Sequence, residues 1–189
     1  SMGGVGTLVG GILMVVWKGA SRQTYAILGT SLFISFMLII IPIGQQIWML
    51  ALGAFIVMAA APIAAASSQT LWQKKVEASY QGRVFSLRNT IMRSAQPLAF
   101  LSAGFLADNY FEPSMMEGKG LAQYFGDIWG IGQSRGVALM ISCAGALSMV
   151  FVVLAWMVPG VRRVDIDLPD AEEPKIEVPA DGEPKGEVS

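Results

Sequence analysis

The sequence predicts an all-α protein, a polytopic bundle of transmembrane helices, and three observations support this prediction. Five long apolar runs follow one another and are joined by polar segments. The chain is 53% hydrophobic and only 14% charged, whereas soluble domains carry about 25% charged residues. The segments between the runs also alternate in charge along the chain, which is typical of loops that lie on opposite sides of a membrane.

The predicted spans cover residues 3–17, 25–43, 47–70, 85–107 and 137–158. A helix needs about 20 apolar residues to cross roughly 30 Å of hydrocarbon, and the first run alone falls short of that length. This first run carries Gly6 and Gly10, four residues apart, and the third carries the small-residue segment Ala59–Ser68. Because membrane helices associate by close backbone approach over small residues, we expect both runs to form contacts between helices.

Two segments outside the spans have a distinct character. Trp72–Tyr80 is too charged to cross a bilayer and suits a short interfacial helix. Residues 165–189 hold nine acidic residues against Lys175 and Lys185, with a proline at every fifth position from Pro169. Because this segment has few large apolar residues to bury, we expect it to be a disordered, acidic cytoplasmic tail that follows a membrane domain of residues 1–164.

The orientation follows from the basic residues, which mark the cytoplasmic side of a membrane protein. The connections after the first and third spans and the segment after the fifth are basic, whereas the connections after the second and fourth are neutral or acidic. This alternation predicts a multi-pass protein of the plasma (inner) membrane with its C-terminus in the cytoplasm and its N-terminus outside. An exported N-terminus without a signal peptide predicts that further helices precede this chain.

Several function classes are excluded by what the spans lack. The chain has no histidine and a single cysteine, Cys143, so histidine-based metal sites, Ser-His-Asp catalysis and an internal disulfide are excluded. No Asp or Glu lies within a predicted span, so we expect neither an intramembrane enzyme nor a proton carrier in this chain. We expect no metal and no cofactor. The basic residues are scattered at membrane boundaries, which argues against nucleic-acid binding.

The fourth span carries the candidate site. Ser86, Asn89, Arg93 and Gln96 fall within a sector of about 80° on a helix, and Arg88 points away from them. A charge inside a span costs about 2.5–3.5 kcal/mol, so this polar face must meet protein, water or lipid headgroups. It lines a substrate cavity, belongs to a buried structural hydrogen-bond network, or contacts headgroups. Arg88, one turn from the cytoplasmic end, is expected to anchor at the boundary.

An ordered series of motifs carries a resemblance to a known family. It comprises Gln81–Arg88, Gln96-Pro97-Leu98, Ala103–Asp108, Phe111-Glu112-Pro113 and Gly130–Gly136. The series resembles the eleventh helix, and the loop before the twelfth, of bacterial major facilitator superfamily transporters of the macrolide-efflux and siderophore-exporter type. The resemblance implies that the five spans are helices eight to twelve of a twelve-helix fold, forming most of its C-terminal half.

The resemblance further implies a secondary active transporter that exports amphipathic small molecules by alternating access. Ser86, Asn89, Arg93 and Gln96 would then line the substrate cavity, and Arg83 and Arg22 would lie in cytoplasmic gating loops. The expected partners are a small-molecule substrate, the lipid bilayer and the missing N-terminal helices of the same protein. The alternative is a non-transporting five-span membrane subunit or anchor whose acidic tail recruits a cytoplasmic partner.

Overall fold

The computed structural model describes residues 2–16, 22–44, 46–116 and 120–167, and all regular structure in them is helical. The all-α prediction is therefore confirmed for this part of the chain. The elements are α1 (Met2–Val16), α2 (Gln23–Ile40), η1 (Ile41–Ile43), α3 (Ile47–Lys75), α4 (Ala78–Leu106), η2 (Ala107–Phe111), α5 (Glu112–Ser114), α6 (Gly120–Trp129), α7 (Arg135–Met157), α8 (Pro159–Arg162) and α9 (Val164–Asp167). The η1 turn is a 3₁₀-helix and η2 is a π-helix.

Among the described residues, three helices are long and apolar enough to cross a membrane, which is fewer than the five predicted. They are Gln23–Ile43, Ile47–Lys75 and Arg135–Met157. The first predicted span appears as α1, whose 15 residues are short of the length that a bilayer requires. The fourth appears as α4, which is 29 residues long. The polar residues of its candidate site lower its hydropathy, so that α4 is long enough but not apolar enough.

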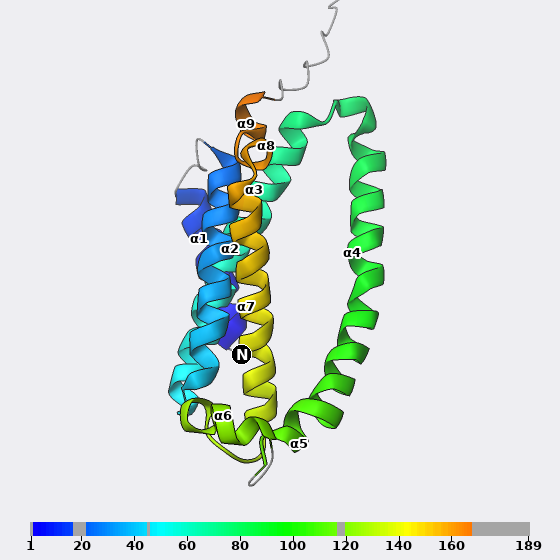
Figure 1. Ribbon diagram of the computed structural model, residues 1–189. Coiled ribbons are helices and arrows are strands. Elements are labelled where there is room, and N and C mark those ends of the chain that lie inside the picture. The colour runs from blue at the N-terminus through cyan, green and yellow to red at the C-terminus, as the bar shows by residue number, and fades with distance from the viewer. Residues whose placement is uncertain (1, 17–21, 45, 117–119, 168–189) are drawn as a thin grey trace, which may run out of the picture.

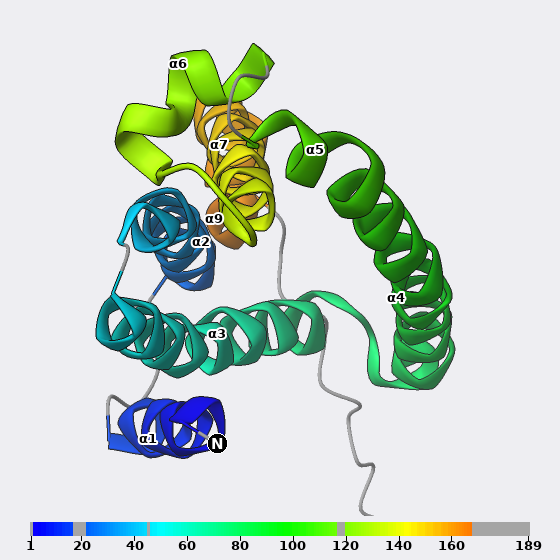
Figure 2. The ribbon, with the colours of Figure 1, turned by 90° about the horizontal axis from the view of Figure 1, so that it is seen from below.

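Four of the long helices pack as a bundle in the order α1, α3, α2, α7 (Figure 2). Small residues allow the close approaches. The backbone of Gly10 lies against Ala59, which confirms that the two small-residue runs form a contact between helices. The Ser35 and Ser148 hydroxyl oxygens are 2.8 Å apart between α2 and α7, and Ser35 is only 1% exposed. Close packing and buried hydrogen bonds of this kind hold membrane helices together.

The structure overturns the prediction of a separate interfacial helix at 72–80. Residues up to Lys75 continue α3, the chain is extended at Val76, and α4 begins at Ala78. The physical reason is length: α3 has 29 residues, and a helix of that length extends about 44 Å, well beyond the hydrocarbon layer. Its last, charged turn can therefore stay helical in water, where Lys74 and Lys75 complement the negative end of the helix dipole.

Helix α4 stands apart from the bundle formed by α1, α3, α2 and α7 (Figure 1). None of its residues is buried. It is joined to α3 by the turn at Val76 and Glu77 at one end of the molecule, and at the other end it runs on through η2 and α5 toward α7. The predicted acidic tail lies outside the described residues, except for its first three, which belong to α9.

Candidate functional site

The four predicted cavity residues lie together in the middle part of α4. Ser86, Asn89, Arg93 and Gln96 are all exposed. In the part of the chain that the structure describes, the guanidinium of Arg93 has no ion pair or hydrogen bond, and the amides of Asn89 and Gln96 have none either. The face thus presents one cation, two amides and a hydroxyl, none of which is engaged by another residue that the structure describes.

Arg88, on the other face of α4, is engaged instead. Its Nη2 donates a hydrogen bond of 2.9 Å to Ser68 Oγ on α3, and its guanidinium lies 5.7 Å from the centre of the Trp72 ring. Gln81 Nε2 also donates to the carbonyls of Gln73 and Val76, at 3.1 and 2.9 Å. These bonds hold the first third of α4 against the end of α3. The sequence analysis expected Arg88 to anchor at the membrane boundary and did not predict this contact between helices.

The two predicted gating residues lie at the end of the molecule where α3 ends and α2 and α4 begin (Figure 1). Arg83 is exposed in the second turn of α4. Arg22 is the residue that precedes α2, and its guanidinium lies 5.6 Å from the centre of the Tyr25 ring. The structure does not bring Arg22 and Arg83 into contact with each other, so they do not form one cluster.

At the opposite end, the structure joins two motifs that are far apart in the sequence. Glu112 Oε2 accepts a hydrogen bond from the Ser134 backbone N–H at 3.1 Å, and Oε1 accepts one from the Val137 N–H at 3.3 Å. A carboxylate in this position satisfies free N–H groups and favours the positive end of the helix dipole. Glu112 is therefore the N-terminal cap of α7, a role that the sequence analysis did not assign.

The loop before α7 has positive φ angles, which allow the beginning of α7 to reach Glu112. Gly130, Gly132 and Ser134 have φ values of 83°, 123° and 69°, in the region that favours glycine. The Gly132 N–H donates to the carbonyl of Met115 at 3.2 Å, and the Met115 side chain is fully buried. The glycine-rich segment is thus folded back over the turn that follows α5, which holds the beginning of α7 in place.

Replacing Glu112 with alanine is expected to lower the free energy of unfolding by about 1 kcal/mol, the usual effect of losing a helix cap. The measurement is the thermal unfolding midpoint of the chain in a mild detergent, followed by circular dichroism. Asp127→Ala is the matched control, because Asp127 is exposed on α6 and the substitution removes the same charge. Equal midpoints for the two variants would contradict the capping role.

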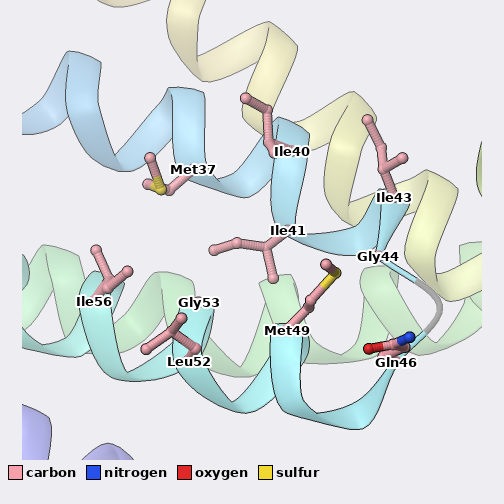
Figure 3. Close-up of a pocket in the computed structure, with 10 residues that line it drawn as sticks. All are labelled: Met37, Ile40, Ile41, Ile43, Gly44, Gln46, Met49, Leu52, Gly53 and Ile56. Carbon is pink, nitrogen blue, oxygen red and sulfur yellow. The ribbon is translucent and has the colours of Figure 1, made fainter.

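An apolar pocket of about 570 Å³ lies between the end of α2, η1 and the beginning of α3 (Figure 3). Its wall is made of isoleucine, methionine and leucine side chains, and Gln46 contributes an amide at one edge. None of the predicted site residues lines it. The pocket offers space for an apolar group but no cluster of polar groups that would do chemistry.

Among the residues that the structure describes, no three His, Cys, Asp or Glu side chains come together as they would around a metal ion. In comparisons with known protein families, curated proteins and solved structures, the chain matches none of them. The features of this chain that point to a function are therefore the geometry of α4 and the family resemblance of its sequence.

Proposed function

We propose that this chain is the C-terminal portion of a secondary active transporter of the major facilitator type, which exports amphipathic small molecules by alternating access. The observation that carries the proposal is the exposed polar face of α4 beside three helices able to cross a membrane. If α4 also crosses, Arg93 must face protein or water, because a charge toward lipid costs about 2.5–3.5 kcal/mol. No other part of the described chain covers this face.

The partner of that face is proposed to be the missing N-terminal helices of the same protein. Together with α4 they would enclose a water-filled cavity near the middle of the bilayer, where transporters of this kind bind substrate. The Arg93 guanidinium would hold carboxylate, phosphate or carbonyl oxygens of a substrate, and Asn89 and Gln96 would add amide donors and acceptors. Exposed apolar residues on the same helix, such as Phe100 and Leu101, suit the apolar part of an amphipathic molecule.

The proposed orientation has the basic end of the bundle in the cytoplasm of the plasma (inner) membrane. The beginning of α2, the end of α3, the beginning of α4 and the short helix α8 lie at one end (Figure 1). These helix ends carry Arg22, Lys74, Lys75, Arg83 and Arg162. Positive residues accumulate on the cytoplasmic side. By the resemblance to the major facilitator family, the spans would be helices eight to twelve, with α1 as the eighth.

The substitution Arg93→Ala is tested in the protein as it occurs in its own cell membrane. It is expected to reduce efflux per transporter molecule by about tenfold, which is the effect of losing one charged hydrogen bond. The measurement is accumulation of radiolabelled erythromycin, divided by the amount of protein in the membrane. Arg93→Lys keeps the charge but not the planar pair of donors, so its efflux per molecule should lie between that of Arg93→Ala and that of the unsubstituted protein.

Arg88→Ala is the charge-matched control, because Arg88 lies on the opposite face of α4 and bonds Ser68. It should lower the amount of protein and leave efflux per molecule unchanged. If Arg93→Ala also leaves efflux per molecule unchanged, the polar face is structural and the proposal fails. The alternative function, a membrane anchor with a recruiting tail, depends on residues 165–189, of which the structure describes only 165–167.

A further inference from the structure

A hollow of about 370 Å³ lies at the basic end of the bundle, between the beginning of α2 and the short helices α8 and α9. Its lining is polar and contains three arginines: the residues are Arg22, Tyr25, Arg162, Arg163, Ile166 and Asp167. The two sides of the hollow are separated by more than a hundred residues in the sequence and are brought together by the packing of α2 against α7. It is distinct from the polar face of α4.

The hollow is held in shape by contacts behind it. The Asp165 Oδ2 atom accepts a hydrogen bond of 2.8 Å from the Thr24 backbone N–H and so caps α2. Lys75 Nζ donates to the carbonyl of Asp165 at 3.3 Å, which ties α9 to the end of α3. The Tyr25 ring packs edge-on against Trp156 of α7, with centroids 5.8 Å apart. The walls therefore exist before any ligand arrives, which lowers the cost of binding.

The charge of the hollow is positive. Three guanidiniums line it and one carboxylate, that of Asp167, opposes them. The other nearby carboxylate, Asp165, is occupied as the cap of α2. Within the described ranges, neither Arg162 nor Arg163 has an ion pair with an acidic side chain. A guanidinium presents parallel N–H donors that match two oxygens of a phosphate, so unpaired arginines around a hollow suit a phosphate group.

The position of the hollow indicates where that phosphate comes from. Arg22 immediately precedes α2, and Arg162 and Arg163 follow α7 within six residues; both helices are long and apolar enough to cross a membrane. Tyr25 and Trp156 lie at the same helix ends, where aromatic rings favour the headgroup layer. Basic pockets between transmembrane helices on the cytoplasmic side bind acidic lipid headgroups.

We propose that this hollow is a binding site for a phosphate group, supplied by the headgroup of an anionic phospholipid. The site goes beyond the proposed transport function, since it requires only that α2 and α7 cross the membrane. Bound there, the lipid phosphate would bridge the beginning of α2 to α8, and so link the second and last spans at the membrane surface.

The experiment is a lipid titration of the purified, delipidated chain in detergent, read by native mass spectrometry. The probes are phosphatidylglycerol, which is anionic, and phosphatidylcholine, which carries no net charge. Arg162→Gln with Arg163→Gln is expected to weaken phosphatidylglycerol binding by about tenfold or more, because each guanidinium makes a charge-assisted bond. Lys74→Gln with Arg83→Gln is the matched control, since it removes the same charge at the same end of the bundle, outside the hollow.

The outcomes separate the possible explanations. The site is supported if the protein prefers phosphatidylglycerol, if Arg162→Gln with Arg163→Gln abolishes that preference, and if Lys74→Gln with Arg83→Gln retains it. Displacement of the lipid by millimolar inorganic phosphate would retain a phosphate site but overturn a lipid as its occupant. The proposal would be overturned if both double variants lost affinity for phosphatidylglycerol equally, or if the unsubstituted protein bound the two lipids equally well. If the glutamine pair does not stay monodisperse, Arg162→Lys with Arg163→Lys is used, and it should weaken binding by about threefold through loss of the planar donors.

Discussion

Gly10→Ala is expected to lower the free energy of unfolding by about 2–3 kcal/mol, the upper part of the range for overpacking a close contact. A Cβ atom added at Gly10 would overlap the carbonyl group of Ala59 on α3 and would lie 3.1 Å from its Cα. The obstacle is backbone, so no side-chain rotation relieves it, and α1 must move away from α3. Because α1 packs on α3 alone among the long helices of the described chain, that movement removes its main contact.

The measurement is the thermal unfolding midpoint of the chain in mild detergent. Samples are heated to a series of temperatures, and the monodisperse peak that remains is measured by size-exclusion chromatography. Gly11→Ala is the matched control, because nothing lies within 4 Å of a Cβ at Gly11. Alanine favours a helix over glycine by about 1 kcal/mol at both positions, so Gly11→Ala should raise the midpoint slightly. Two substitutions at neighbouring residues should therefore act in opposite directions, and a shared direction would contradict close packing at Gly10.

Much of the bundle could be predicted from local sequence patterns. The apolar runs at 25–43, 47–70 and 137–158 correspond to α2 with η1, α3 and α7, with ends shifted by a few residues. The small residues Gly6 and Gly10 identified a contact face of α1. These features follow from composition and spacing within one helix, and a sequence records both directly.

The contacts between distant segments could not be predicted in this way. Asp165 caps α2 from 141 residues away, and Glu112 caps α7 across the loop that follows α5. Helical periodicity specifies which side chains share a face, but not which helix end approaches another. The fourth predicted span corresponds to α4, which is long enough to cross a membrane but less apolar than α2, α3 and α7, because polar residues interrupt its apolar run.

The candidate site shows the same division. Periodicity predicts that Asn89, Arg93 and Gln96 share one face of a helix, and in the structure all three lie on α4 and are exposed. It does not predict that Arg88 bonds Ser68, because that bond depends on how α4 leaves α3 at Val76. What the polar face contacts depends on the helices that cover it, and we propose that these helices belong to the same protein.

Gly136→Ala is expected to have an effect comparable to that of Gly10→Ala, about 2–3 kcal/mol, at the other end of the bundle. A Cβ at Gly136 would lie 2.5 Å from the Cα of Glu112 and would also overlap the peptide group that joins Phe111 to Glu112. The turn formed by η2 and α5 would have to withdraw from α7. Gly104→Ala is the control, since it also adds a methyl group to a helix but meets nothing within 4 Å.

The decisive measurement is the coupling between this substitution and the loss of the cap. If α7 begins where it does because Glu112 reaches its free N–H groups, then displacing Glu112 with a methyl group at Gly136 already breaks both of those hydrogen bonds. The double variant Gly136→Ala with Glu112→Ala should then be hardly less stable than Gly136→Ala alone, since residues in one contact are not additive. Full additivity of the two losses in thermal unfolding would mean that the close approach and the cap stabilise α7 independently.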